Sequence, residues 1–264
     1  MLTRSGELVL RWNEAAQAWG PVQGDAPAGF DGADVGLYEV LRVSASPYAL
    51  RLHADRIARS WQRLTGRPFA SEHVPSLPDA RAEAIRRQWP GFRFEVRGFA
   101  DGSAVAQIRR RERTSVKPPV RLLAVESDGA ESAYPHKSVD RRHLTQSYER
   151  AVAAGADDAL FVVGGEVREA AQAFVALVTA EAFVLPPLRE DVLPSTTRTA
   201  AADWCRDNGR AVIERPIRME DLDHGTLIYG NALVGLLPAF LAEQGARPLP
   251  AWFSAPAIER RLAG

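Results

Sequence analysis

Lysine is rare in this chain, and its rarity draws attention to one position. Only two of the 33 lysine and arginine residues are lysines, Lys117 and Lys137. A coding bias toward arginine explains the skew, but it also means that arginine serves wherever a positive charge is enough. A surviving lysine is then a candidate for what arginine cannot do, which is to lose its proton and form a Schiff base. Lys117 lies in the proline-rich segment SVKPPV and is interpreted as a linker residue, so Lys137 is the candidate for chemistry.

Three other segments carry side chains that could serve the same chemistry. Glu169, in GGEVREAA, is a carboxylate on an expected turn between strands, where an exposed turn residue is the simpler interpretation. Ser195, Thr196 and Thr197 open an expected helix, either as an ordinary N-cap or as a phosphate cradle made with the first backbone N–H groups. Arg56 lies on another expected helix and is either solvated or a bidentate phosphate ligand.

These side chains match the needs of pyridoxal 5'-phosphate (PLP). This cofactor needs a lysine for its Schiff base, a carboxylate that keeps its pyridine nitrogen protonated, and an anchor for its phosphate. Lys137, Glu169 and the Thr196–Thr197 pair could supply the three in turn. They are far apart in the sequence, so the fold must position them.

The hydrophobic pattern predicts the elements that do so. Strands are expected at 7–13, 36–43, 92–99, 103–110, 120–127 and 159–167, as a hairpin within 172–187, and one each in VIERPIR (212–218) and TLIYGNALVGLLPAF (226–240). Helices are expected at 49–64, 78–89, 143–155 and 198–209. Strands dominate both halves, which favours two α+β domains. We place a small N-terminal domain at 1–115 and a larger cofactor-binding domain at 116–264.

Composition narrows the class of protein. The chain has 264 residues, of which 46% are hydrophobic and 25% charged, and its net charge is zero. This balance gives no electrostatic reason to expect nucleic acid or a membrane as a partner. No apolar run approaches the roughly 20 residues of a membrane helix, and the first residues show no signal-peptide pattern. The single cysteine, Cys205, and five histidines without paired spacing predict no metal site. We therefore expect a cytoplasmic enzyme with a small-molecule substrate.

Five motifs, in order, resemble the class IV aminotransferases, the fold-type IV PLP enzymes. This family includes D-amino-acid and branched-chain aminotransferases and 4-amino-4-deoxychorismate lyase. The motifs are GLYEVLRV with LRLHADRIARSWQRL, HKSVDR, GADDALFVVGGEVREAAQAFVAL, LPSTTR and GNALVGLLPA, which together run from about residue 36 to residue 240. The resemblance implies a two-domain α+β fold like that of D-amino-acid aminotransferase, with a barrel-like sheet in the larger domain, and it implies a homodimer.

The resemblance also assigns roles. It places Lys137 at the Schiff base, Glu169 on the pyridine nitrogen and Leu193 near the ring. The residues that it places around the phosphate are Arg56, Ser195, Thr196, Thr197, Asn231 and Ala232. Three features depart from the family pattern. Phe174 replaces an asparagine, Ser195 replaces a glycine, and Ala170 with Ala171 replaces small polar residues. These changes could remove hydrogen bonds to the cofactor, but they leave the lysine, glutamate and threonines in place.

The reaction has three interpretations. HKSVDR and GNALVGLLPA lean toward 4-amino-4-deoxychorismate lyase, which releases pyruvate and leaves 4-aminobenzoate, a folate precursor. Tyr38 and Val40, within Tyr38-Glu39-Val40, instead resemble the substrate pocket of aminotransferases that act on D- or branched-chain amino acids. Arg109 is either a ligand for a substrate carboxylate or a solvated strand end. We place the lyase first, an aminotransferase second, and a PLP-binding homologue without turnover third.

Overall fold

The computed structural model describes residues 9–13, 16, 18–21, 33–69, 75–112, 116–127, 136–189 and 192–263. The chain divides into two units. The first unit comprises Met1–Arg113 and His136–Asp140, and the second comprises Thr114–Pro135 and Arg141–Ala263. The segment that carries Lys137 therefore groups with the first unit. These units are groups of residues in contact with one another. The expected division into domains of residues 1–115 and 116–264 therefore stays a prediction.

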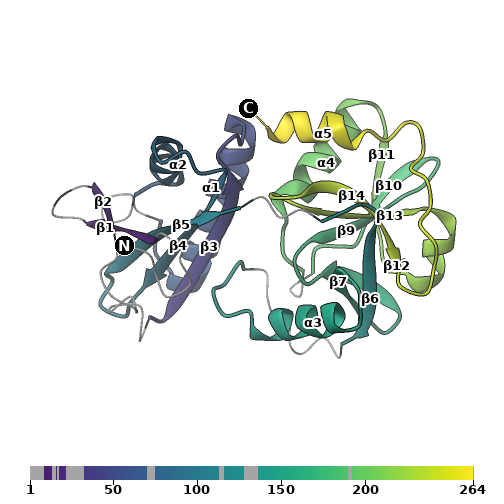
Figure 1. Cartoon of the computed structure of the whole chain (residues 1–264), viewed down its shortest axis with the longest axis horizontal. Helices are drawn as coiled ribbons and strands as arrows, with labels where there is room; N and C mark the ends of the chain where they lie inside the picture. The colour runs from purple at the N-terminus through teal and green to yellow at the C-terminus, as the bar shows by residue number, and fades with distance from the viewer. Residues whose placement is uncertain are drawn as a thin grey trace. The chain divides into compact units, whose positions relative to one another are not determined.

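An antiparallel sheet in the order β2–β1–β5–β4–β3 forms the centre of the first unit (Figure 1). Its strands are β1 (Val9–Asn13), β2 (Ala18–Pro21), β3 (Val35–Arg42), β4 (Gly91–Gly98) and β5 (Ala104–Arg111). Phe92, Phe94 and Ile108 are fully buried on one face of the sheet. Arg93, between the two phenylalanines, and Arg109, after Ile108, point to the other face and pair directly with each other. This period of two is what the sequence predicted for the two strands.

Two helices of the first unit pack against its sheet. Helix α1 (Pro47–Thr65) contacts β3, and α2 (Leu77–Arg86) contacts β4. The Ser46 side chain accepts a hydrogen bond from Ala49 N to begin α1, and Gly66 ends it with a φ of 70°. The second helix stops before its expected end at residue 89, because Gln88 takes a left-handed φ of 56°.

A mixed nine-stranded sheet in the order β11–β10–β9–β13–β14–β6–β7–β8–β12 forms the second unit. Its strands are β6 (Val120–Glu126), β7 (Asp158–Val163), β8 (Glu166–Ala170), β9 (Phe174–Val178), β10 (Ala182–Leu185), β11 (Ala211–Glu214), β12 (Ile217–Arg218), β13 (Thr226–Asn231) and β14 (Gly235–Leu241). Helices α3 (Arg142–Ala153), α4 (Thr196–Asp207) and α5 (Ala255–Leu262) all cover the same face of this sheet, α3 over β6 and β7 and the other two over β9, β13 and β14 (Figure 1).

The chain path shows that this sheet curls. The strands at its two edges, β11 and β12, are separated along the chain by only Arg215 and Pro216. Two residues cannot span a flat nine-stranded sheet, because strands lie about 4.8 Å apart. The edges must therefore approach each other, and the sheet forms a half-barrel, as expected for the larger domain. Its interior is filled by apolar side chains such as Val120, Leu177 and Val184.

Several expected elements need correction. VIERPIR forms two short strands on opposite edges rather than one, because Pro216 lacks the N–H that a continuous ladder needs. TLIYGNALVGLLPAF is a hairpin of β13 and β14, not a single strand. The sequence analysis missed β2 and α5. Residues 7 and 8 of the first expected strand lie outside the described residues.

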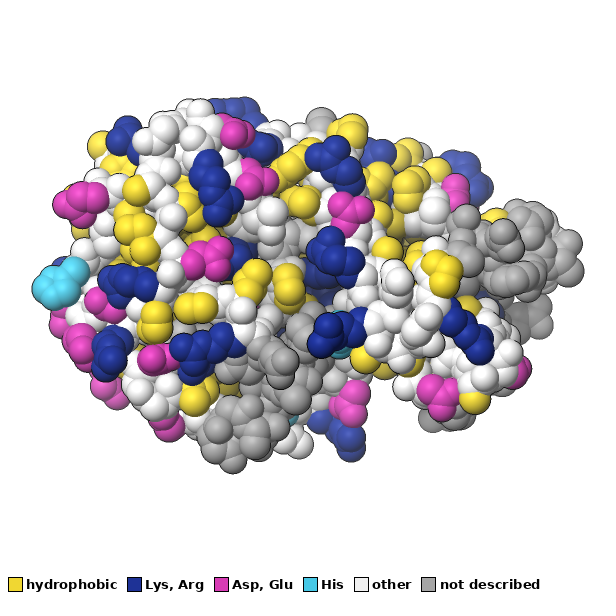
Figure 2. All heavy atoms as spheres, turned by 180° about the vertical axis from the view of Figure 1, so that it is seen from behind, with side chains coloured by type: hydrophobic (Ala, Val, Ile, Leu, Met, Phe, Trp, Pro, Cys, Tyr) yellow, Lys and Arg dark blue, Asp and Glu magenta, His cyan; other side chains and the backbone are white. Residues whose placement is uncertain are grey.

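The described surface carries mixed charge. On the face shown in Figure 2, basic and acidic side chains are interspersed rather than gathered by sign. None of the described helices has both the length and the apolar character needed to cross a membrane. Within the same residues, no group of histidine, cysteine, aspartate and glutamate side chains is arranged to hold a metal ion.

Candidate active site

Lys137 lies on a short extended segment that pairs with β3. The Tyr38 N–H donates to the Lys137 carbonyl oxygen (2.9 Å), and the Val139 N–H donates to the Gly36 carbonyl oxygen (2.9 Å). Gly36 permits this close approach, since a Cβ there would collide with the Val139 side chain. The main chain therefore fixes Lys137 beside the strand that carries Tyr38. Helix α3 begins five residues later, at Arg142, as the pattern after Lys137 predicted.

Tyr38 sits between two cationic side chains. Its side chain is buried, the Lys137 Nζ lies 4.9 Å from its ring centroid, and the Arg93 guanidinium carbon lies 3.9 Å from it. Both distances are in the range of cation–π attraction. Arg93 also forms an ion pair with the buried Glu95 (2.9 Å). Burial lowers the pKa of Arg93, although Glu95 opposes that shift. A lysine amine thus lies close to an aromatic ring in a locally positive environment.

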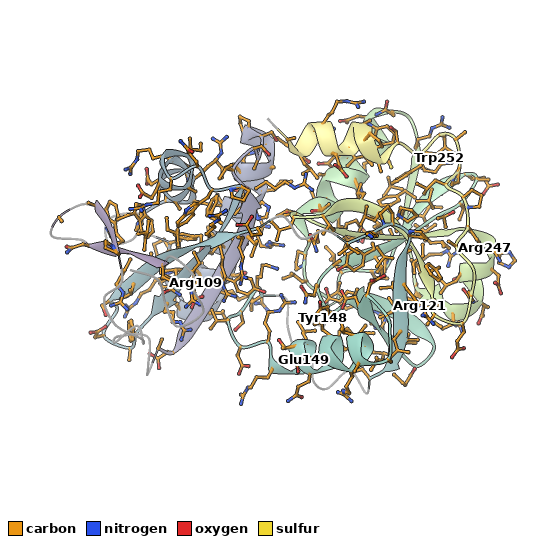
Figure 3. All side chains as sticks on the ribbon, viewed as in Figure 1. Arg109, Arg121, Tyr148, Glu149, Arg247 and Trp252 are labelled. Atoms are coloured by element: carbon orange, nitrogen blue, oxygen red, sulfur yellow. The ribbon has the colours of Figure 1, made fainter. Side chains whose placement is uncertain are left out.

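Arg93 also connects the other predicted substrate residues. It pairs with Val40 on β3 and with Arg109 on β5, so the three side chains share one face of the sheet. Figure 3 shows Arg109 on this sheet. Sequence reasoning missed Arg93, although the alternation in FRFEVRGF, with charged residues at every second position, could have shown it. The structure therefore brings Tyr38, Val40 and Arg109 together on one sheet face around Arg93.

Arg56 is buried, and Glu39 binds its guanidinium. Its Nε donates to Glu39 Oε1 (2.8 Å) and its second terminal nitrogen contacts Oε2. The His53 Nδ1 lies 2.7 Å from Glu39 Oε2. Burial alone would raise the pKa of Glu39, but Arg56 and His53 outweigh it and lower that pKa to about 2. Arg56 is therefore fixed in orientation by an ionised carboxylate, and it is not a solvated helix residue.

Glu169 lies within β8 and not on a turn, which corrects the expected location. The pairing of β7 with β8 shifts beside it. Leu160 pairs with Ala170 and Val162 with Val167, so one residue on β7 faces two on β8. This is the geometry of a β-bulge, which turns side chains out of the regular alternation and is common beside active sites. The buried Glu169 is one of the two bulged residues.

Helix α4 begins where the sequence predicted. Ser195 is the N-cap, and its Oγ accepts a hydrogen bond from Arg198 N (3.4 Å). Thr196, Thr197 and the preceding Leu193 are buried. Among the described residues, the Thr197 Oγ1 has no hydrogen-bond partner, although it is shielded from solvent. A buried hydroxyl without a partner is costly, so this position needs an explanation, and an oxygen of a bound phosphate is one that fits.

Asn231 shapes the turn that follows β13. Its Oδ1 accepts from Leu233 N (2.9 Å) and Val234 N (3.0 Å), and its Nδ2 donates to the Gln172 carbonyl oxygen (3.2 Å). These bonds fix the backbone around Ala232. Phe174, which replaces the family's asparagine, is buried in the apolar core, and a Cβ on Gly230 would collide with its ring. Phe174 therefore serves packing in this chain.

Comparison with known proteins identifies the family. Residues 36–240 match the family model described as amino-transferase class IV, so the chain belongs to the class IV aminotransferases. Enzymes of this family depend on PLP, and this chain is a PLP-dependent enzyme. No protein with a curated description matches the chain significantly.

Three solved structures share its fold. A protein from Legionella pneumophila, described as a candidate 4-amino-4-deoxychorismate lyase, is 22% identical with a TM-score of 0.73, over 89% of this chain and 93% of that one. A fold IV transaminase from Curtobacterium pusillum is 18% identical with a TM-score of 0.77, over 97% of each chain. A hypothetical aminotransferase from Mycobacterium tuberculosis, solved with PLP, is 17% identical with a TM-score of 0.76, over 96% and 97%.

The residues present fit PLP. The unpartnered Thr197 Oγ1 lies at the N-terminus of α4, where backbone N–H groups and the helix dipole favour a phosphate. The bulge that sets Glu169 apart in β8 suits a carboxylate that must reach a ring nitrogen. Lys137 belongs to the first unit, and Glu169 and Thr197 belong to the second.

Proposed function

We propose that this chain is a 4-amino-4-deoxychorismate lyase, which converts its substrate to 4-aminobenzoate and pyruvate in folate biosynthesis. The observation that carries this proposal is the position of the Lys137 amine, 4.9 Å from the Tyr38 ring on a sheet face that also presents Arg93 and Arg109. The substrate of this lyase carries two carboxylates. A site with several arginines suits such a dianion better than it suits a substrate with an apolar side chain.

The family resemblance assigns the donors for the cofactor. Lys137 would bind it covalently, and Glu169 would accept a hydrogen bond from its ring nitrogen. The phosphate contacts would come from Arg56, Ser195, Thr196, Thr197 and the turn at Asn231 and Ala232, with Leu193 against the ring. The orphan hydroxyl of Thr197 supports this assignment for α4.

The chain's own residues would manage the protons of the reaction. When bound, PLP withdraws electrons from the carbon that bears the substrate's amino group. The Lys137 amine would remove the proton from that carbon and return one to the pyruvate fragment as it leaves. Glu169 would keep the ring nitrogen protonated. Arg93 and Arg109 would hold the substrate carboxylates, and the Tyr38 ring would limit where the Lys137 amine can move.

An aminotransferase is the second candidate. Tyr38, Glu39 and Val40 supply the observation that favours it, because this triplet resembles the strand of D-amino-acid aminotransferases and Tyr38 does lie next to Lys137. The two activities begin with the same proton removal and differ in the bond that breaks next. Val40 shares a sheet face with Arg93, so it would line the pocket whose shape decides which of the two substrates is accepted.

One experiment separates the candidates. The purified protein, loaded with PLP, is incubated with 4-amino-4-deoxychorismate, and pyruvate and 4-aminobenzoate are measured together. The lyase predicts equal amounts of both products when no keto-acid co-substrate is added. Amino-group transfer from an amino acid to a keto acid, with no pyruvate from aminodeoxychorismate, would reject the lyase and support the aminotransferase. The resemblance also supports a homodimer, which analytical ultracentrifugation would test, and the composition supports a cytoplasmic location.

A further inference from the structure

Asp158 is a fully buried carboxylate that the proposed reaction does not use. It is the first residue of β7, and its side chain has no exposed surface. Its neighbour Asp157 is different, because it accepts one hydrogen bond from Arg121 N (2.8 Å) in an exposed position. Burying a carboxylate is costly unless hydrogen bonds replace its water. The groups around Asp158 should therefore show what its position achieves.

Three donors from three segments surround this carboxylate. Its Oδ1 accepts from Ala159 N (2.8 Å). Its Oδ2 accepts from Gln172 N (3.1 Å) and from the Tyr229 hydroxyl (3.0 Å). Each oxygen thus faces a backbone N–H group, which can only donate. An asparagine could not satisfy both sides, since its NH₂ group would meet one of those backbone donors.

The two distant partners lead to the proposed cofactor residues. Gln172 lies in the turn three residues after Glu169, and its carbonyl oxygen accepts the bond from Asn231 Nδ2 (3.2 Å). Tyr229 lies two residues before Asn231 on β13. Asp158 is therefore bonded both to the turn that follows Glu169 and to the strand that ends at Asn231.

We propose that Asp158 is a positioning residue that fixes the end of β8 after Glu169 and the turn at Asn231 relative to each other. This inference rests on the proposed PLP site, because Glu169 would contact the ring end of the cofactor and the Asn231 turn its phosphate end. Loss of the shared carboxylate would let the two contacts separate. Activity would then fall through weaker cofactor binding and not through loss of a reacting group.

The charged surroundings of Asp158 are mixed. Arg141, whose guanidinium also donates to the Ala171 carbonyl oxygen (2.8 Å), faces it from the start of α3. Burial and Asp158 raise the pKa of Tyr229, and Tyr148 on α3 (Figure 3) and Asp157 add to that shift. Burial raises the pKa of Asp158 to about 6, against the opposing effect of its three hydrogen bonds and Arg141. The ionised carboxylate is the form that accepts all three bonds.

The test compares Asp158→Asn with Asp157→Asn, a matched control at the adjacent carboxylate. Hydrogen exchange is measured on the PLP-free proteins, and PLP affinity is measured by titration. We expect Asp158→Asn to speed exchange in both 168–174 and 229–236 and to weaken PLP binding about tenfold. Asp157→Asn should leave both segments and PLP affinity unchanged. Unchanged exchange in either segment of Asp158→Asn, or equal effects of the two variants, would overturn the proposal.

A second variant and the exchange data cover the cases in which Asp158→Asn does not fold or the protein binds no PLP. If Asp158→Asn does not fold, Tyr229→Phe removes one of the three donors, and it should speed exchange in 229–236 and weaken PLP binding by a smaller factor. Normal exchange and normal PLP affinity in Tyr229→Phe would then reject the role of Asp158. If the wild-type protein binds no PLP, the proposed function fails, whereas the exchange data still decide whether Asp158 couples the two segments.

Discussion

The main chain joins Lys137 directly to Tyr38, since the Tyr38 N–H donates to the Lys137 carbonyl oxygen across 2.9 Å. The two side chains also meet, with the amine 4.9 Å from the ring centroid. The position of Lys137 is therefore set by a β-pairing with β3 and not by the helix that follows it. Changes that disturb this pairing should affect catalysis without removing any reacting group.

Gly36→Ala tests this pairing. The added Cβ would collide with Val139 and push the Lys137 segment away from β3, which should lower kcat and cost about 1–3 kcal/mol of stability. Gly20→Ala is the control, because no atom lies within 4 Å of its added Cβ. The measurements are steady-state kinetics and denaturant unfolding. Equal kinetics in the two variants would contradict this role for Gly36.

Glu39→Gln should destabilise the first unit in a pH-dependent way. It leaves the buried Arg56 without its counter-charge, a loss of about 3–5 kcal/mol at pH 7. The folded-state pKa of Glu39 is about 2, below its ordinary value of 4.5. The stability that Glu39 contributes is thus complete above pH 4.5 and is lost as the pH falls toward 2. The stability difference between wild type and variant should shrink over that window. Glu112→Gln, at an exposed ion pair, should show no such trend.

Thr197→Val should separate cofactor binding from stability. The hydroxyl has no partner among the described residues, so its removal should leave the PLP-free protein equally stable or more stable, by up to about 1–3 kcal/mol. PLP affinity should fall, because a phosphate contact is lost. Thr226→Val is the opposite control, since that hydroxyl donates to the Pro248 carbonyl oxygen (2.6 Å). It should lose stability and keep its PLP affinity. Normal PLP binding by Thr197→Val would remove Thr197 from the phosphate site.

Arg109→Gln should raise KM for aminodeoxychorismate about tenfold, because a charged hydrogen bond to a carboxylate contributes about 1.5–3 kcal/mol. Arg110→Gln changes the next residue on the same strand, whose side chain lies on the opposite face and is half exposed. It should leave KM unchanged. Similar KM values for the two variants would show that the sheet face around Arg93 does not bind the substrate.

Much of the fold was predictable from local sequence patterns, and the predictions that failed have physical causes. The hydrophobic pattern predicted β4 and β5, and the polar residues from Ser195 to Thr197 predicted the start of α4. One expected strand is divided at Pro216, where the chain passes from one edge of the curled sheet to the other. The meeting of the two edges is a long-range property that the local sequence does not show. The Glu169 bulge was also hidden, since it arises from pairing with β7 and not from the β8 sequence itself.

The roles of the candidate site residues stay predictions. The sequence proposed Lys137, Thr197 and Arg109 from residue type, order and resemblance. It could not show that Glu39 binds Arg56, because those residues are 17 positions apart and meet only when α1 packs on β3. Arg93 and Asp158 were missed for the same reason. Their importance lies in contacts with Tyr38 and Tyr229, which no local pattern reveals.

The central claim is that PLP is bound covalently to Lys137. The most direct test is borohydride reduction of the PLP-loaded protein, followed by mass spectrometry of its peptides. We predict that the mass of reduced pyridoxyl phosphate is found on the peptide that contains Lys137. Label on Lys117 instead, or a protein that takes up no PLP, would contradict the account.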